Sequence, residues 1–381
     1  MSDNVIIFGA GASDDAGIPL MDGFVQKMWE FAIRGRTGEE QLSDEDHKIF
    51  LEAMKIKGEL DTYHGRAMFD DRNLEDILSI LSFNEMSGKK GSKRRLSVFL
   101  KAISRTIELT CLTKHSGEIR IQTEGPNVYR SFWNRLIEWY RNRREFPTII
   151  TFNYDLVLER AFFQVLNNFI YQIRTIPFGA VSFNYHYDMF DQTIYTVEST
   201  RYVIDDDDFK DKEGTRLLQG GKGNPVPIEI LKLHGSVNFP SKKDVRNYSL
   251  VSPVDDPLIM PPIFSKMTYG QALDKAWGEA LRKLRQAKNV IVVGYSLPRT
   301  DIYMQYFLKS ALGPNVDLNA IYVFDPVLFG ENEASKEMID RYASCFSPQL
   351  QSRIVFRPRG SSPERQGSFN HFESVLRSIL F

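Results

Sequence analysis

Four polar side chains each stand just after a short apolar run, where they could take part in chemistry. Asn153 and Asp155 follow one run, and His234 and Ser296 each follow another. A neutral histidine can accept a proton, and a carboxylate can stabilise a positive charge that develops nearby. An amide can orient a substrate or a water molecule. Together these residue types suit proton transfer beside a charged intermediate.

A glycine-bearing turn follows the first apolar run, and it consists of Gly9, Ala10, Gly11, Ala12 and Ser13. Such a turn lets the backbone approach a pyrophosphate, and a helix beginning near Ser13 or Asp14 would add N–H donors. The third glycine of the dinucleotide fingerprint is missing, so a plain strand-to-helix turn is the alternative. Asp14 and Asp15 would repel a phosphate unless they point away.

Five apolar runs that alternate with helical patterns predict the fold class, and they cover residues 5–8, 148–151, 228–233, 289–293 and 320–324. Continuous apolar runs of this length are typical of strands buried in a parallel sheet. We therefore expect an α/β, Rossmann-like sheet whose carboxyl edge gathers the polar groups. Gly235 and Ser236 beside His234 are small, so we expect the imidazole not to be packed away.

The domain organisation follows from the same patterns, and we expect one domain over residues 1–381. Its Rossmann-like core should comprise about 1–24, 146–170 and 228–358. Apolar residues at helical spacing predict a large helical insertion over 25–145. The stretch 171–227 shows no convincing period, so we expect loops and hairpins, an irregular insertion near the active site.

Composition excludes several classes of function. The 48 basic and 49 acidic side chains nearly cancel, so we expect no direct nucleic-acid binding and no membrane partner. The basic run at 88–95 is expected to be a solvated loop. Two cysteines, Cys111 and Cys345, cannot build a disulfide framework or a thiolate zinc site, and no metal is expected. Without a signal peptide or an apolar span, we expect a cytoplasmic protein.

The ordered motifs resemble those of the sirtuin family, across residues 5 to about 326. They are the glycine turn at 9–13, then Ala16, Gly17, Ile18 and Pro19, then 151–155, 233–236 and 294–297. The resemblance implies an NAD+ diphosphate site at Ala10, Gly11, Ala12 and Ser13. It places Asn153 and Asp155 by the nicotinamide and its ribose, His234 as the catalytic histidine, and Gly294 and Ser296 on the adenosine side.

Departures from the sirtuin deacylases point to a subgroup. Phe152 stands where those enzymes usually have Gln, and Leu20, Met21 and Asp22 stand where they have Asp-Phe-Arg. The four-cysteine zinc module is also missing. The chain thus resembles the bacterial anti-phage sirtuin-like NADases, which hydrolyse NAD+ to nicotinamide and ADP-ribose. In length the chain resembles the stand-alone members of that group, which assemble with a hexameric HerA-type ATPase. The resemblance therefore implies such a partner, and we also expect a homo-oligomer.

The chemistry implied by this resemblance is consistent with the residues. Nicotinamide leaves as a neutral molecule, so positive charge develops on the ribose as an oxocarbenium ion. Asp155 could offset that charge, Asn153 could orient the carboxamide or a water, and His234 could accept a proton. Two alternatives stay open: a protein deacylase or ADP-ribosyltransferase, and a non-catalytic regulator that only binds NAD+.

Overall fold

A nine-stranded sheet forms the centre of the computed structural model. The structure describes residues 3–38, 40–62, 70, 72–116, 120–123, 128–167, 177–187, 194–202, 212–219, 224–241, 249–260, 272–299, 301–330, 332–356 and 368–380. The sheet order is β15 (Ile354–Phe356), β14 (Ala320–Phe324), β13 (Asn289–Val293), β1 (Asn4–Phe8), β6 (Thr148–Thr151), β10 (Val226–Lys232), β7 (Ala180–Asn184), β8 (Ile194–Tyr202) and β9 (Lys212–Gln219).

The strands from β15 to β7 run parallel, whereas β8 and β9 continue the sheet as antiparallel strands. The expected α/β, Rossmann-like fold and its five strands are confirmed. In the register, Phe8 of β1 lies beside both Val293 and Thr151, and Lys232 lies beside Thr151. The segments that follow β13, β1, β6 and β10 therefore begin next to one another.

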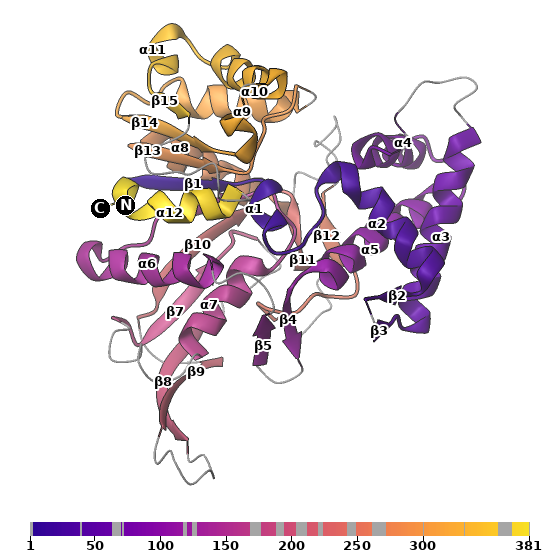
Figure 1. Cartoon of the computed structure of the whole chain (residues 1–381), viewed down its shortest axis with the longest axis horizontal. Helices are drawn as coiled ribbons and strands as arrows, with labels where there is room; N and C mark the ends of the chain where they lie inside the picture. Colours follow the sequence, from indigo (N-terminus) through magenta and orange to yellow (C-terminus); the bar gives the residue numbers. More distant parts are fainter. Residues whose placement is uncertain are drawn as a thin grey trace.

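Alternating side chains of the strands form two apolar layers, one on each face of the sheet. On β1, Ile6 and Phe8 pack into one layer and Val5 and Ile7 into the other. The first layer is covered by α6 (Val128–Arg143), α7 (Val157–Asn167) and α12 (Ser368–Leu380) (Figure 1). The second is covered by α8 (Asp274–Gln286), α9 (Ile302–Leu312) and α10 (Glu333–Ser344). Burial on both faces explains the continuous apolar runs.

The predicted helical insertion forms a lobe beside the sheet (Figure 1), and its buried side chains are continuous with the first apolar layer. It contains α2 (Met21–Arg34), α3 (Asp44–Asp61), α4 (Leu74–Met86) and α5 (Ser92–Thr110). Helix α6 lies within the predicted insertion range 25–145, but it packs on the sheet core instead, through Phe132 against Phe8. Helix α12 also joins the core, although the predicted core stopped at about 358. A helical period in the sequence predicts a helix, but it does not show which part of the protein that helix packs against.

Charged residues on the lobe helices pair with one another. Arg94 and Arg95, from the basic run at 88–95, form ion pairs with Glu52 and Glu59 of α3. Exposed pairs of this kind contribute little to stability, but they satisfy two of the run's positive charges within the chain. No helix in the described part of the chain is long and apolar enough to cross a membrane.

Glu229 on β10 makes stability depend on pH. Burial acts to raise its pKa, but hydrogen bonds from His186, Lys283 and Thr148 and the charge of Lys283 lower that pKa to about 2. A lowered pKa stabilises the fold fully above the unfolded value, about 4.3, and this contribution is lost as pH falls towards 2. We expect Glu229→Gln to reduce the free energy of unfolding by up to about 3 kcal/mol at pH 7.

Urea unfolding at pH 7 and at pH 3 measures this effect. The difference between wild type and Glu229→Gln should shrink at the lower pH, because the wild-type carboxylate then loses its advantage. Glu40→Gln, at an exposed position, should change stability little at either pH. An equal loss at both pH values in Glu229→Gln would contradict the prediction.

Candidate functional site

The loops that follow β1 and β13 cross in close contact. The Gly9 N–H donates to the Val293 carbonyl (3.0 Å), and the Gly11 N–H donates to the Gly294 carbonyl (2.9 Å). Gly294 has a positive φ of 63°, and a Cβ at this position would overlap the Ala12 nitrogen. Only glycine combines that backbone conformation with so close an approach. The crossing therefore fixes the glycine turn against the adjacent strand end.

The glycine turn leads into α1 (Gly11–Asp14), a single helical turn that begins at Gly11 and not near Ser13 or Asp14 as expected. The N–H groups of Gly11, Ala12 and Ser13 donate to carbonyls of the same two loops, at 2.9, 2.9 and 3.0 Å. These three N–H groups are thus hydrogen-bonded within the crossing. Within the segments 9–13 and 294–297, Ala10 and Ser296 are exposed, and Gly11 and Tyr295 are half-buried.

Asp15 points towards the C-terminal helix. Its carboxylate accepts hydrogen bonds from the Phe369 N–H (3.1 Å), the Asn370 N–H (3.4 Å) and the Asn370 side-chain amide (2.8 Å). Burial raises the pKa of Asp15, and the hydrogen bonds from Asn370 and Phe369 oppose that rise. The Phe369 ring stacks on Phe8 with 5.3 Å between centroids. The charge of Asp15 therefore supports the start of α12 instead of repelling a ligand.

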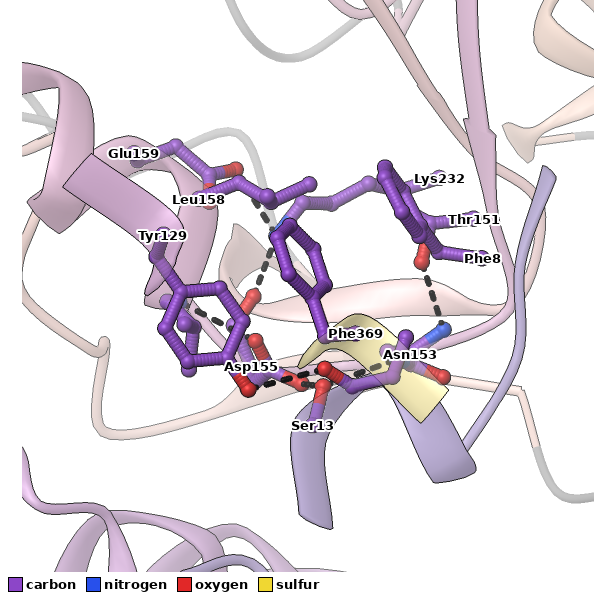
Figure 2. Close-up of a pocket in the computed structure, with 12 residues that line it drawn as sticks. Phe8, Ser13, Tyr129, Thr151, Asn153, Asp155, Leu158, Glu159, Lys232 and Phe369 are labelled. Carbon is purple, nitrogen blue, oxygen red and sulfur yellow. Dashed lines mark hydrogen bonds and ion pairs between the residues drawn. The ribbon is translucent and has the colours of Figure 1, made fainter. Parts of the chain in front are cut away.

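Ser13, Asn153 and Asp155 form a hydrogen-bonded cluster where the loops after β1 and β6 meet (Figure 2). The Ser13 hydroxyl donates to Asp155 Oδ2 (2.6 Å), and Asn153 Nδ2 donates to Ser13 Oγ and to the Gly9 carbonyl, both at 2.8 Å. Asp155 Oδ1 accepts from the Val157 N–H at 3.0 Å, at the start of α7. Three of the predicted site residues are brought together in this cluster.

A small pocket lies against this cluster, and Figure 2 shows the residues around it. Its volume is about 10 Å³, which is room for about one water molecule. A small-molecule site needs several hundred Å³, so this pocket, which is lined by both apolar and polar side chains, is too small to hold a nucleotide. It is lined by Phe8, Ala12, Ser13, Tyr129, Thr151, Asn153, Asp155, Val157, Leu158, Glu159, Lys232 and Phe369.

His234 follows the next strand, β10, and lies among aromatic rings. Its ring centroid is 5.2 Å from that of Phe152, 6.2 Å from that of Tyr154 and 6.3 Å from that of Trp277. The residue is only 6% exposed, so the expectation that small neighbours would leave it open is wrong. Trp277 belongs to α8, which packs over the end of β10. The residues adjacent to His234 in the sequence give no sign of this contact.

Lys232 is a site residue that the sequence prediction missed. It is 1% exposed, and its ammonium group lies 2.5 Å from the Asp155 carbonyl, 3.0 Å from Ser236 Oγ and 2.9 Å from Glu159 Oε1. The available signal was a lysine next to Leu231 and Leu233 in a strand that is expected to be buried on both faces. A buried lysine needs a carboxylate partner, but the sequence does not show that the partner, Glu159, lies on α7.

The remaining predicted motif residues connect the glycine turn to the helical lobe. Gly17 has a φ of 85°, and a Cβ there would lie 2.8 Å from the Thr110 carbonyl at the end of α5. Ile18 is buried and Pro19 half-buried, just before α2. The three residues lie at the junction of the sheet and the lobe, and the Ile18 N–H donates to the Ser13 carbonyl at 3.4 Å.

One group of side chains has the geometry of a metal site, but a lysine already supplies its cation. His186, Glu229 and Glu279 place ligand atoms within 4.8 Å of one another. The Lys283 ammonium lies 2.5 Å from Glu229 and 3.7 Å from Glu279.

Cys111 is not suited to bind a metal either. Burial raises the pKa of Cys111 to about 12, so that thiol stays protonated and is a poor ligand.

Comparisons with known proteins give likeness at the level of shape. The sequence matches no protein-family model and no curated protein. A Sir2 homologue in complex with NAD is 14% identical with a TM-score of 0.35, covering 99% of this chain and 90% of that one. A mutant Sir2 homologue with ADP-ribose is 14% identical with a TM-score of 0.32, covering 90% and 91%. The sheet order and the parallel register carry the fold assignment.

Proposed function

We propose that this chain is an NAD+ glycohydrolase, which cleaves the bond between nicotinamide and ribose. The observation that carries the proposal is the Ser13–Asn153–Asp155 cluster, which joins the glycine turn to the end of the neighbouring strand. His234 follows β10, the strand that pairs with β6 on the side away from β1. A glycine turn, an amide, a carboxylate and a histidine at one sheet edge suit a nucleotide whose ribose becomes positively charged.

The residues account for each part of the reaction. Cleavage sends the bonding electrons to the nicotinamide ring, which leaves neutral, and the ribose becomes an oxocarbenium ion. A water molecule then attacks, and its proton goes to His234, so that NAD+ and water yield nicotinamide, ADP-ribose and a proton. Asp155 supplies negative charge near the reacting sugar. Asn153, anchored through its amide nitrogen to Gly9 and Ser13, orients the substrate or the water.

The test incubates the purified chain with NAD+ and measures free nicotinamide and ADP-ribose. We expect both products in equal amounts without any acceptor protein. Nicotinamide that appears only when an acylated peptide is added would identify a deacylase and contradict the proposal. Binding of NAD+ without release of nicotinamide, with or without a partner protein, would identify a non-catalytic regulator and contradict it as well.

We also propose that the enzyme works as a homo-oligomer with a hexameric HerA-type ATPase, in bacterial anti-phage defence by NAD+ depletion. The support is the sirtuin-like motif set. Trp29 and Ile33, one turn apart on α2, are 49% and 60% exposed, and exposed apolar groups of this size suit a protein contact. Because uncontrolled NAD+ loss would kill the host, we expect low activity alone and higher activity in the assembly.

A further inference from the structure

Two side chains that flank His234 hold the neighbouring loop. Lys232 and Ser236 each stand two residues from His234 in the chain. The Lys232 ammonium donates to the Asp155 carbonyl (2.5 Å), and the Ser236 hydroxyl donates to the Tyr154 carbonyl (3.1 Å). Lys232 also donates to Ser236 Oγ at 3.0 Å. The segment around His234 is thus hydrogen-bonded to the backbone of the segment that carries Asn153 and Asp155.

We propose that Lys232 and Ser236 are positioning residues that set His234 at a fixed distance from Asn153 and Asp155. The catalytic consequence rests on the proposed NAD+ hydrolysis, whereas the positioning itself can be measured without it. A misplacement of about 1 Å between reacting groups costs on the order of 100-fold in rate. A fixed spacing between the two loops is therefore a requirement of the reaction.

The donor count at Lys232 supports this role. An ammonium group has three N–H donors, and Lys232 has three acceptors in place: the Asp155 carbonyl, Ser236 Oγ and Glu159 Oε1. Glu159 is itself 1% exposed and accepts from the Tyr185 hydroxyl at 3.0 Å. Lys232 is thus paired with Glu159 of α7 and donates to the carbonyl of Asp155 in the loop after β6.

Stability alone does not explain a buried ion pair at this place. Desolvating both charges offsets most of their attraction, and apolar residues of similar volume often give equal or greater stability. The Lys232–Glu159 pair lies between the sheet and α7, where apolar side chains surround it in the core. What an apolar pair could not provide is a donor for the carbonyl of Asp155.

Other contacts keep the two segments folded when the lysine is removed. The Val237 N–H donates to the Tyr154 carbonyl (2.9 Å), and the Met260 N–H donates to the His234 carbonyl (2.8 Å). The Tyr154 hydroxyl donates to the Met260 carbonyl at 2.7 Å. Removing Lys232 should therefore loosen the spacing of the loops rather than unfold them.

The test uses Lys232→Met combined with Glu159→Gln, so that no unpaired charge stays buried. The glutamine oxygen can still accept from Tyr185. We expect kcat for nicotinamide release to fall about 10- to 100-fold, while KM for NAD+ stays within about threefold, because the exposed loop residues are unchanged. Hydrogen exchange should speed up in the backbone of 152–157 and 234–238.

The matched control is Lys283→Met with Glu229→Gln, which removes another ion pair of the same strand, away from the Asp155 loop. It should keep wild-type kcat and wild-type exchange at 152–157. Ser236→Ala, which leaves the ion pair intact, should lower kcat by a smaller factor than the double variant. Unchanged exchange at 152–157 in the Lys232 double variant, or an equal change in the control, would overturn the proposal.

The two ideas fail in different ways. If the wild-type chain releases no nicotinamide under any condition, the proposed function is wrong, and the exchange data still decide whether Lys232 positions the loop. If the wild type is active and the double variant keeps both its kcat and its slow exchange, the proposed function stands and the positioning role is wrong.

Discussion

Replacing His234 by alanine should lower the rate of nicotinamide release by about 100-fold or more. The imidazole is the group that can take the proton of the attacking water, and no other site side chain that we assign has that role. NAD+ binding should persist, because the exposed loop residues Ala10 and Ser296 are untouched. Steady-state kinetics and NAD+-dependent thermal shifts separate the loss of kcat from the retained binding.

Asn153→Ala should instead lower both binding and rate. Its amide nitrogen donates to Gly9 and to Ser13, so its loss frees the glycine turn as well as removing a group from the site. His47→Gln is a control, because His47 contacts the Ala32 carbonyl within the helical lobe, and it should leave the rate unchanged. Full activity in both the His234 and the Asn153 variants would refute the assignment of these residues.

Gly294→Ala should strongly destabilise the fold at this edge of the sheet. The new Cβ would overlap the Ala12 nitrogen and the Gly11 carbonyl carbon, and the residue would keep a positive φ of 63°. A non-glycine residue in the left-handed region costs about 1–2 kcal/mol, and forced repacking adds about 1–3 kcal/mol. We expect a stability loss of about 2–5 kcal/mol, with loss of NAD+ binding.

Gly278→Ala provides the matched control in urea unfolding. Gly278 lies on α8, and a Cβ there meets nothing within 4 Å. Alanine is favoured over glycine inside a helix by about 0.8–1.0 kcal/mol, so this variant should become slightly more stable. A Gly294→Ala protein with wild-type stability would show that the two loops can separate without cost, contrary to the crossing described above.

The sequence was sufficient to predict the sheet and the edge at which the site lies. Strands buried on both faces carry uninterrupted apolar runs, and parallel strands bring their carboxyl ends together. Asn153 and Asp155 lie beside the glycine turn, as the convergence of strand ends predicts. The hydrogen bond from the Ser13 hydroxyl to Asp155 is not visible in the motif. A motif shows which residue types are present but not which partner each one bonds.

Contacts between distant parts of the chain were beyond the sequence. The bond from the Phe369 N–H to Asp15 spans 354 residues, and no local pattern links those positions. The burial of His234 depends on Trp277 of α8, and the engagement of Gly11 depends on the crossing with Gly294. In each case a side chain's environment is set by tertiary packing, which composition and periodicity do not encode.

The contact between the glycine turn and α12 has a consequence for folding. β1 lies between β6 and β13, and the turn after it is braced by a residue 354 positions further along the chain. Contacts of such long sequence separation close large loops and form slowly. A chain that lacks α12 would thus carry every residue of the proposed site without the brace that holds the glycine turn in place.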